Sequence, residues 1–305
     1  MTEKPTKNFA ESVRRRLLNQ AKEQNVEFTH ILIRFAIERT LYRLSISEHA
    51  DRFCLKGAML LALWSKQPYR PTLDVDLLSV GDPSIESMRK IFSDVLKIDC
   101  PEDALVIKSD ALKLQPIKEG QQYEGLRITF SCELAQAIVP VQIDIGFGDV
   151  VTPSPIKLAY STILELPAPV IYTYPRETVV AEKFEAMVKL GMANTRMKDL
   201  ADVYFLATTF GFEGELLASA ISATFNRRST MIPHDFPTVL TEQFYGNSDK
   251  QKQWSGFLKK SKIGTLSLEM VCLALGVFLM PLCQAIRGEK SPPNSWVPMS
   301  GWDHE

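Results

Sequence analysis

The sequence predicts an α+β protein in which a small mixed or mostly antiparallel sheet is flanked by an N-terminal helical segment and a C-terminal helical domain. Between residues 51 and 150, short runs rich in β-branched residues alternate with turn residues, as strands do. Before and after that region, apolar residues recur at helical spacing. We therefore expect N-terminal helices (1–50), a central core (51–165), a helical domain (166–287) and an extended tail (288–305).

Composition bounds the class of protein. A chain of 305 residues that is 45% hydrophobic can bury a large core and should fold as two or three packed units. Its 35 basic and 36 acidic residues nearly cancel, which excludes a globally basic nucleic-acid binder but leaves room for a local basic patch. The five scattered cysteines contain no C-x-x-C pair, which indicates a reduced compartment and disfavours a thiolate zinc site.

No segment is expected to enter a membrane. The N-terminus, MTEKPTKNFAESVRRR, lacks the apolar core of a signal peptide. The longest apolar run, LEMVCLALGVFLMPLC, is too short to span a bilayer and carries a proline near its end, so it is interpreted as a buried helix. These features predict a soluble, cytoplasmic protein.

Two helices are expected at the start of the chain. Residues 8–24 place Phe9, Val13, Leu17 and Leu18 on one stripe, and the Arg14–Arg16 triplet is more consistent with a solvated face than with a nucleic-acid contact. The second helix should run from a cap at Thr29 to about Leu44, with Ile31, Phe35, Leu41 and Leu44 on its apolar side.

The stretch from Phe53 to Val80 is the most informative part of the chain. A short apolar strand leads through Lys56 and Gly57 into the helical run AMLLALW and then into a second strand, LDVDLLSV. Strand alternation sends Asp74 and Asp76 to one face and their apolar neighbours to the other. Two adjacent carboxylates on an apolar strand repel each other unless a cation lies between them, so a divalent metal is expected.

The following residues supply a third acid. A helix capped by Ser84 should extend to Ile98, followed by strands over 105–109, 111–117, 125–134 and 138–150. On the last strand Gln142 and Asp144 share one face, and apolar residues occupy the other. After a proline-rich loop from Val151, helices are expected over 177–190, 195–210, 213–226, 249–261 and 267–286, and the remaining tail should be an extended arm.

These residues suit metal-dependent nucleotidyl transfer. That reaction needs a nucleoside triphosphate (NTP), divalent ions held by clustered carboxylates, and an acceptor hydroxyl in line with the α-phosphate. Asp74, Asp76 and Asp144 would hold Mg²⁺ or Mn²⁺ if their two strands are neighbours. Gly57 would allow backbone amides to approach a phosphate.

Five motifs in matching order resemble the AbiEii/AbiGii toxin family of the nucleotidyltransferase superfamily. They are L-K-G at 55–57, R-x-x-x-D-x-D at 70–76, Q-I-D-I-G-F-G-D at 142–149, A-E-K at 181–183 and R-M-K-D-x-x-D at 196–202. The resemblance implies a fold like the DNA polymerase β palm and a toxin of a toxin-antitoxin or phage-defence system. It also implies transfer of nucleotides to RNA, with tRNA as the expected acceptor.

The resemblance also assigns roles to individual residues. It makes Asp74, Asp76 and Asp144 metal ligands, with Asp144 completing the metal site or acting as general base, and Lys183 the fourth catalytic residue. The nucleotide-binding set that it implies consists of Lys56, Gly57, Arg70, Lys183, Lys198, Asp199 and Asp202. In this set Lys183 and Lys198 steady the triphosphate, while Asp199 and Asp202 orient the lysines or the acceptor.

One departure from the superfamily pattern bears on phosphate binding. The superfamily usually places a serine or threonine hydroxyl after the glycine, where this chain has Ala58 and Met59. Backbone amides can still hold the phosphate, but more of the binding then falls on Lys183 and Lys198.

Each motif also has a structural interpretation. A lone Asp-x-Asp pair is often solvated, Lys183 by itself resembles a solvated helix residue, and Lys198 with Asp202 forms a helix-face pair. The lysine-rich helix KQKQWSGFLKKSK at 250–262 could grip a tRNA backbone or simply be solvated around core aromatics. The four histidines show no ligand spacing.

The leading hypothesis is therefore an NTP-using nucleotidyltransferase toxin that modifies RNA and has a cognate antitoxin as a possible partner. Transfer to a protein or a small molecule is an alternative with the same chemistry. A different class of function is a catalytically weak NTP-binding module that acts on a partner through its helical domain, which the missing hydroxyl at Ala58-Met59 motivates.

Overall fold

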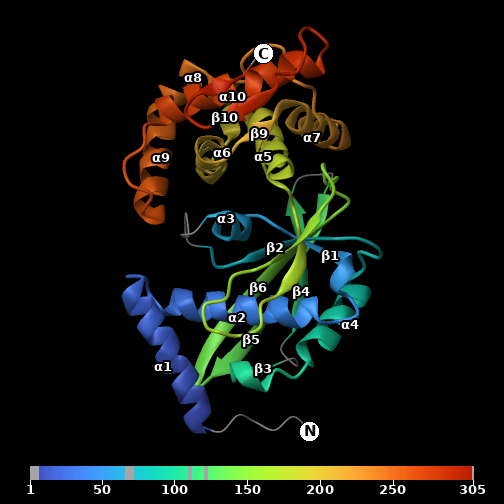
Figure 1. The fold of residues 1–305 in the computed structure, drawn as a ribbon, viewed down its shortest axis with the longest axis vertical. Coiled ribbons are helices and arrows are strands. Elements are labelled where there is room, and N and C mark those ends of the chain that lie inside the picture. Colours follow the sequence, from blue (N-terminus) through green and yellow to red (C-terminus); the bar gives the residue numbers. More distant parts are fainter. Residues whose placement is uncertain (1–6, 66–71, 109–111, 120–122, 304–305) are drawn as a thin grey trace. The chain divides into compact units, whose positions relative to one another are not determined.

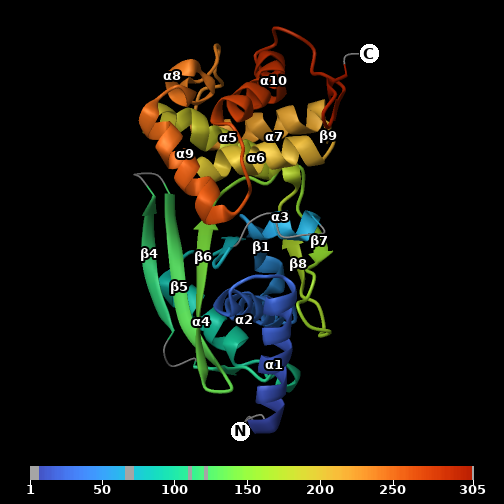
Figure 2. The same cartoon turned by 90° about the vertical axis from the view of Figure 1, so that its left-hand side faces the viewer.

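A computed structural model describes residues 7–65, 72–108, 112–119 and 123–303 of the chain. It contains two compact units, coloured by sequence in Figures 1 and 2. Unit 1 comprises Met1–Gly148 and Ile156–Thr173, and unit 2 comprises Asp149–Pro155 and Tyr174–Glu305. Unit 1 holds the sheet, and unit 2 is mainly helical, which confirms the predicted α+β class.

The sheet of unit 1 has eight strands in the order β3-β5-β6-β2-β1-β8-β7, with β4 paired to β5. Their bounds are β1 (Phe53–Lys56), β2 (Val75–Ser79), β3 (Val106–Ile107), β4 (Lys113–Glu119), β5 (Tyr123–Leu134), β6 (Ala137–Phe147), β7 (Ile156–Ala159) and β8 (Val170–Thr173). The β2–β6 and β1–β8 pairs are parallel, and the other pairs are antiparallel. The sheet is therefore mixed, and its two carboxylate-bearing strands, β2 and β6, are neighbours.

Helices cover the apolar face of this sheet. Unit 1 has helices α1 (Lys7–Glu23), α2 (Phe28–Ser45), α3 (Met59–Trp64) and α4 (Ile85–Leu96). Helix α2 packs on β6, β8 and α4, and it crosses the sheet in Figure 1. On β1 and α4, the Phe53 and Phe92 rings meet edge to face with centroids 5.7 Å apart. Because side chains alternate along each strand, the residue that follows Phe53 on β1 projects from the opposite face of the sheet.

The helix boundaries largely follow the sequence pattern. The side chain of Ser84 caps α4 by accepting a hydrogen bond from the Ser87 amide, as predicted. Glu27, not Thr29, occupies the N-cap of α2. The predicted inward position of Phe9 is wrong because its side chain is 40% exposed, whereas Val13 and Leu17 on the same helix are buried. The buried stripe of α1 runs through Ala10, Val13, Leu17 and Ala21, so Phe9 lies beside it.

Unit 2 is a bundle built around α5. Its helices are α5 (Arg176–Leu190), α6 (Met197–Thr209), α7 (Gly214–Arg227), α8 (Glu242–Tyr245), α9 (Ser248–Ser261) and α10 (Leu268–Ile286). Helices α6 and α7 both pack on α5, and α10 packs on α6 and α7. Phe184 and Phe225 join α5 to α7 through buried rings 5.4 Å apart. The predicted helical spacing after residue 175 therefore marks a real core.

Two segments that were predicted to be irregular form strands instead. The proline-rich stretch contains β7 and β8, because short runs between prolines find partners in each other and in β1. The tail forms β10 (Ser295–Val297) and β11 (Gly301–Trp302), which pair with each other, while β10 also pairs with β9 (Phe212–Glu213). The Trp296 indole donates to the Ala207 carbonyl (2.6 Å), and the Trp302 indole donates to that of Phe278 (2.9 Å), so the tail is packed against the bundle.

Helix α10 matches the helix predicted over 267–286 and extends beyond the apolar run that ends at Cys283. It continues through Pro281 to Ile286, and over the described residues it is the helix whose length and composition would allow it to cross a membrane. The expectation that it is too short is therefore wrong. Half of its most apolar window is buried in unit 2, including Val271, Leu275 and Phe278, as in a core helix.

Candidate functional site

A row of four charged residues crosses the centre of the unit 1 sheet. In the strand register, Lys56 on β1 lies opposite Asp76 on β2, Asp76 lies beside Asp144 on β6, and Asp144 lies opposite Arg127 on β5. Paired residues on neighbouring strands project from the same face. The residues one step along, Leu55, Leu77, Ile145 and Leu126, are all buried. The charged row therefore lies on one face of the sheet and its apolar neighbours lie on the other.

The register brings the predicted second and third acids together. Asp76 and Asp144 occupy equivalent positions on adjacent parallel strands, which are separated by about 4.8 Å in any sheet. Asp144 is 18% exposed at its side chain, and Asp76 is half-buried, so both carboxylates remain accessible to solvent ions. The condition set by the sequence, that the two strands be neighbours, is met.

Asp74 lies immediately before β2, one pleat repeat from Asp76. Its carboxylate accepts a hydrogen bond from the Thr72 hydroxyl (2.8 Å), which fixes its orientation. Its neighbour Val75 is buried. Alternation thus places Asp74 and Asp76 on the same face, as predicted.

Gly57 lies directly against Asp76. Its φ of +77° is a conformation that favours glycine. A Cβ atom at this position would lie 2.1 Å from Asp76 Oδ2 and 2.9 Å from the Asp76 Cβ, so no larger residue fits without moving the carboxylate. The L-K-G motif therefore shapes the space around Asp76. Helix α3 begins at Met59 and its N-cap, Ala58, contributes no side-chain hydrogen bond.

Arg127 was not identified from the sequence. Its guanidinium donates from Nε to Asp144 Oδ1 and from Nη2 to Asp144 Oδ2, both at 2.8 Å. These hydrogen bonds raise the pKa of Arg127, and the charges of Asp144, Asp74 and Asp76 act in the same direction. Arg127 is therefore in electrostatic contact with all three acids.

The hairpin that joins β5 to β6 determines the position of Arg127 opposite Asp144. Ala135 and Gln136 both have positive φ and form a two-residue turn between Leu134 and Ala137. That turn fixes the register, and the register sets Arg127 opposite Asp144. The dipeptide Ala-Gln carries none of the usual residues of such a turn, so the pairing was not evident.

The three acids fit a divalent cation. They supply oxygen ligands, which Mg²⁺ and Mn²⁺ prefer, from two neighbouring strands on one partly exposed face. In this structure the oxygens of the three acids do not all lie within 4.8 Å of one another. Among the described residues, a different group of three meets that distance. The bidentate pairing with Arg127 on the β5 side keeps Asp144 engaged away from β2.

That other group is Glu48, His49 and Asp94, near the ends of α2 and α4. His49 Nε2 lies 3.8 Å from Glu48 and 3.5 Å from Asp94, and Glu48 is 84% exposed. These residues have metal-ligating chemistry but lie outside every motif that the sequence singled out. No ligand spacing around His49 was evident in the sequence, because its acidic neighbour Asp94 comes from a distant helix.

In unit 2, Lys183 is the centre of a buried ion-pair cluster. From α5 its ammonium lies 2.8 Å from Asp199 Oδ1 and 2.9 Å from Asp202 Oδ2, both on α6. The two carboxylates are fully buried, and Arg196 donates to the second oxygen of Asp199. Burial alone would lower the pKa of Lys183, but the two acids outweigh it and the pKa is raised. Lys183 is thus not the solvated helix residue of the structural interpretation.

The pKa of Asp199 reflects the same competition between burial and ion pairing. Burial favours its neutral form, but Lys183 and Arg196 dominate and bring its pKa down to about 2. Lys198 next to it is exposed, and the buried partner of Asp202 is Lys183. The R-M-K-D-x-x-D motif therefore contains one exposed lysine, Lys198, and two buried acids, Asp199 and Asp202. Arg70, which was also expected to bind nucleotide, lies outside the described residues.

A second cluster in unit 2 explains further motif residues. Arg228, just after α7, contacts Asp149 (3.0 Å), Glu182 (3.2 Å) and Glu185 (3.0 Å). Burial lowers the pKa of Arg228, but the charges of Glu182 and Asp149 and its hydrogen bonds raise it overall. Asp149 ends the Q-I-D-I-G-F-G-D motif and Glu182 lies in A-E-K, so parts of both motifs serve to join the 149–155 segment, α5 and α7.

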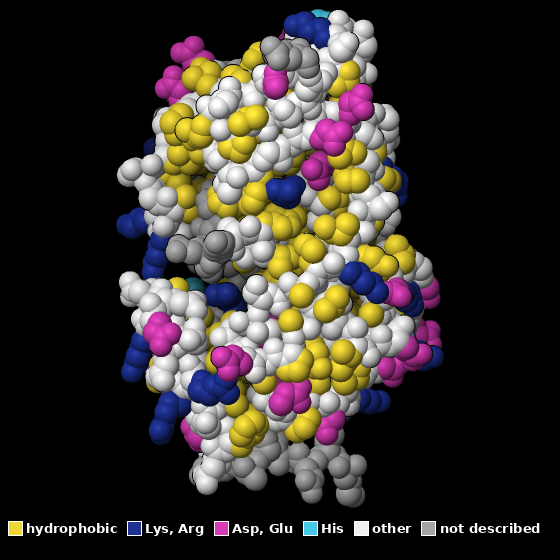
Figure 3. Space-filling model, viewed as in Figure 1, with side chains coloured by type: hydrophobic (Ala, Val, Ile, Leu, Met, Phe, Trp, Pro, Cys, Tyr) yellow, Lys and Arg dark blue, Asp and Glu magenta, His cyan; other side chains and the backbone are white. Residues whose placement is uncertain are grey.

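The lysine-rich helix α9 has one exposed and one buried side. Lys250 is buried and donates to the Asn194 carbonyl (2.8 Å), so it is not available to a polyanion. Exposed lysines occupy the rest of the segment at Lys252, Lys259, Lys260 and Lys262. Figure 3 shows basic and acidic side chains interspersed on one face of the molecule, in line with the balanced net charge.

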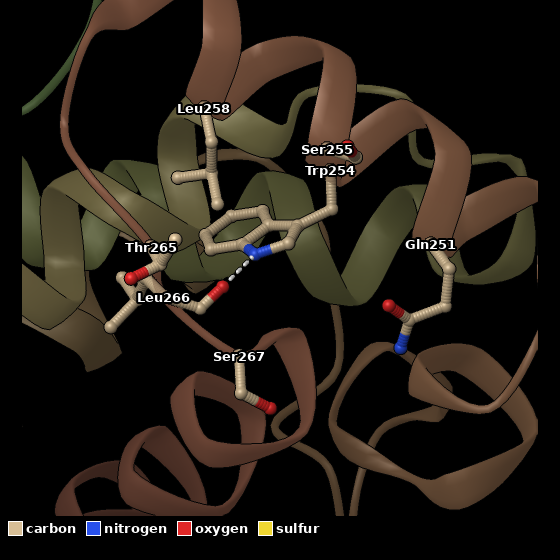
Figure 4. A pocket seen from close by; sticks show the side chains of 7 residues that line it. All are labelled: Gln251, Trp254, Ser255, Leu258, Thr265, Leu266 and Ser267. Carbon is tan, nitrogen blue, oxygen red and sulfur yellow. Dashed lines mark hydrogen bonds between the residues drawn. The ribbon is translucent and has the colours of Figure 1, made fainter.

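An open pocket of about 380 Å³ lies between α9 and the segment that leads into α10 (Figure 4). Trp254, Leu258 and Leu266 line its apolar side, and the polar residues Gln251, Ser255, Thr265 and Ser267 line the remainder. The Trp254 indole donates to the Leu266 carbonyl (2.6 Å), which fixes the ring. The predicted alternative of a helix with core aromatics therefore fits the inner side of α9.

Comparison with known families decides the class of the protein. Residues 39–271 match the family described as the nucleotidyl transferase AbiEii toxin of type IV toxin-antitoxin systems. The chain belongs to the AbiEii family. It is therefore a nucleotidyltransferase, as the resemblance of its motifs predicted, and membership of this toxin family implies a cognate antitoxin.

Solved structures show a weaker likeness to this AbiEii protein. JHP933 from Helicobacter pylori is 15% identical, with a TM-score of 0.42 over 82% of this chain and 90% of that one. A candidate nucleotidyltransferase from H. pylori is also 15% identical, with a TM-score of 0.43 over 86% of this chain and 96% of that one. No curated protein matches the sequence.

Proposed function

We propose that this AbiEii protein is a cytoplasmic, metal-dependent toxin that transfers a nucleotidyl group from an NTP to a hydroxyl of RNA, with tRNA as the expected acceptor. The observation that carries the proposal is the register of the sheet, which sets Asp76 beside Asp144 and one pleat repeat from Asp74. A role in phage defence is part of the same proposal.

The three acids act as ligands in this proposal. Asp74, Asp76 and Asp144 hold Mg²⁺ or Mn²⁺, and such ions supply charge stabilisation and align the attacking and leaving oxygens of a phosphoryl transfer. Thr72 orients Asp74 through its hydrogen bond, and Gly57 leaves room for the Asp76 carboxylate. Lys56, level with Asp76 on β1, brings a positive charge to the same face for the phosphates.

Unit 2 contributes differently. Lys198 is exposed and suits electrostatic binding of a triphosphate. Lys183 has two carboxylates within 2.9 Å, so its role in this proposal is to hold α5 and α6 in place and thereby position Lys198. Asp199 and Asp202 are the groups that orient Lys183. The sequence predicted that both Lys183 and Lys198 bind phosphate. Of these two lysines, the proposal assigns phosphate binding to Lys198 alone.

The lysines of α9 support RNA as the acceptor. Lys259, Lys260 and Lys262 are exposed within four residues at the end of the helix. Lysines that neutralise phosphates release condensed counterions and supply sequence-independent affinity for a nucleic acid. These lysines form a local basic patch, which is consistent with the nearly balanced charge of the whole chain.

Label transfer tests the proposal. The protein is incubated with each of four labelled NTPs, Mg²⁺ or Mn²⁺, and total RNA, and label in RNA is expected for at least one NTP. Asp76→Asn should abolish the transfer. Glu133→Gln, which alters a half-exposed acid elsewhere on the same sheet, should leave it intact. Absence of label in RNA, or full transfer by Asp76→Asn, would overturn the proposal, and label in protein or small molecules would redirect it to another acceptor.

A binding module without turnover is the second candidate. The engagement of Lys183 in two ion pairs and the missing hydroxyl at Ala58-Met59 favour it. This alternative predicts NTP binding by calorimetry without label transfer. It also predicts a growth effect that survives Asp74→Ala combined with Asp76→Ala.

A further inference from the structure

Arg127 holds one of the three proposed metal ligands. Both of its hydrogen bonds to Asp144 measure 2.8 Å, so each carboxylate oxygen has one donor from the same guanidinium. This fork geometry is the strongest form of an arginine–carboxylate pair. In the protein without nucleotide, Asp144 therefore already has a counter-ion.

The topology makes Arg127 a competitor of any ion bound between β2 and β6. Strand β6 lies between β2 and β5, so Asp144 has Asp76 on one side and Arg127 on the other. An ion shared by Asp76 and Asp144 requires an Asp144 oxygen on the β2 side, whereas the fork engages both oxygens from the β5 side. The three acids, as expected from this arrangement, do not form a closed three-ligand group.

The Arg127–Asp144 pair is also able to open. The Arg127 side chain is 42% exposed, so water can take over its hydrogen bonds when the pair with Asp144 opens. A second acceptor lies close by: with the Gln142 amide oxygen toward Arg127, it accepts from Nε at 3.2 Å and from Nη2 at 3.3 Å. Arg127 can therefore keep a partner on β6 when Asp144 turns away.

We propose that Arg127 is a positioning residue that acts as an internal counter-ion, holding Asp144 in the protein without nucleotide and keeping only Gln142 as its partner on β6 when a divalent cation binds Asp144. This inference rests on the proposed function, since it takes the three acids as the metal site. Its consequence is a low affinity for the free cation. A cation that arrives with the negative charge of a triphosphate is favoured over a cation alone.

Binding of Mn²⁺ alone, without NTP or RNA, tests the inference. Calorimetry or the electron paramagnetic resonance signal of free Mn²⁺ gives the affinity of wild type, Arg127→Gln, Arg127→Lys and Lys108→Gln. Arg127→Gln should bind Mn²⁺ about tenfold more tightly, the effect of removing one positive charge roughly 6 Å from a dication in a water-like dielectric. Lys108→Gln removes a positive charge from another ion pair of the sheet and should leave the affinity unchanged.

Arg127→Lys keeps the charge but loses the fork, so its affinity should rise by a smaller factor, about two- to threefold. This variant also serves if Arg127→Gln fails to fold. Unchanged or weaker Mn²⁺ binding in the folded Arg127 variants would overturn the inference.

Asp76→Asn separates the inference from the function on which it rests. If Asp76→Asn abolishes Mn²⁺ binding but Arg127→Gln leaves it unchanged, only the counter-ion role is wrong. If the wild type does not bind Mn²⁺, or Asp76→Asn binds it as tightly as the wild type, the proposed metal site is wrong and the inference falls with it.

Discussion

Two of the charged clusters of this protein contain similar residues but differ in burial and balance. In unit 1, the acids Asp76 and Asp144 lie on an accessible sheet face with one arginine forked onto Asp144. In unit 2, Asp199 and Asp202 are fully buried and share Lys183, while Arg196 adds a second cation. The unit 2 charges are compensated within the protein. The unit 1 acids lie on a partly exposed face and suit an external ion.

A motif alone does not distinguish a residue that binds a ligand from one that stabilises the fold. Both clusters fall within motifs that resemble one family, yet their environments differ. Breaking a buried pair exposes a charge to a medium that cannot solvate it, whereas breaking a half-exposed pair exposes it to water. We therefore expect mutations of the unit 1 acids to affect chemistry and mutations of the Lys183 cluster to affect stability.

The largest expected effect is on activity in unit 1. Asp76→Asn should lower nucleotidyl transfer by about 10³-fold, because it removes a ligand of ions that supply several kcal/mol of transition-state stabilisation. Its melting temperature should change much less than that of a variant in the buried Lys183 cluster, because Asp76 is half-buried and water replaces part of what its carboxylate loses. Label transfer and thermal unfolding measure the two quantities, and a large loss of stability with retained activity would invert the comparison.

The next effect is on stability in unit 2. Lys183→Met should lower the free energy of unfolding by about 3–5 kcal/mol, because two buried carboxylates lose their common cation. Chemical denaturation measures it. Adding Asp199→Asn and Asp202→Asn to Lys183→Met should restore part of the loss, since no uncompensated buried carboxylate then remains and the half-exposed Arg196 is solvated. If the single variant unfolds like wild type, the cluster is not structural.

The pH dependence of stability provides a smaller effect from the same cluster. The pKa of Asp199 is about 2 in the folded protein and near its ordinary value of 3.8 when unfolded. A depressed pKa means that the ionised group stabilises the fold above pH 4 and that this contribution is lost as the pH falls toward 2. Urea denaturation at several pH values should show it, and Asp199→Asn should flatten that part of the curve. A wild-type slope retained in the variant would assign the acid sensitivity elsewhere.

The smallest effect is expected on the lysine face of α9. Lys259→Gln with Lys260→Gln should weaken RNA binding several-fold and reduce the slope of log K against log salt by about 1.4, the value for two contacts to a single strand. Lys250→Gln is not a suitable control because Lys250 is buried against Asn194. Lys157→Gln, an exposed lysine of unit 1, is the matched control. An unchanged salt slope would exclude α9 as the RNA surface.

Alternation made the faces of the strands predictable. The runs around Asp74, Asp76 and Asp144 have period two, so the shared orientation of these acids followed from local sequence. Their juxtaposition did not follow, because the parallel β2–β6 pair joins distant segments through several intervening elements. The same limit hid β8, whose partner β1 lies more than a hundred residues earlier.

The charge states of the site were less predictable than its residues. Lys183 has the sequence context of a solvated helix residue, and only the packing of α5 on α6 buries it between two acids. Arg127 needed the register of a hairpin whose turn, Ala135-Gln136, lacks the usual signature. Pairing partners depend on tertiary structure, which local patterns do not encode.

The parallel β2–β6 pair also bears on when this toxin becomes active during synthesis. Asp74 and Asp76 emerge from the ribosome in the first quarter of the chain, but Asp144 emerges near its middle, after α4, β3, β4 and β5. Contacts between distant segments form late because a long loop must close first. A nascent or prematurely terminated chain that ends before β6 therefore carries Asp74 and Asp76 but lacks Asp144, the third proposed metal ligand. Under the proposed function, the producing cell is exposed to the activity only once β6 has paired with β2.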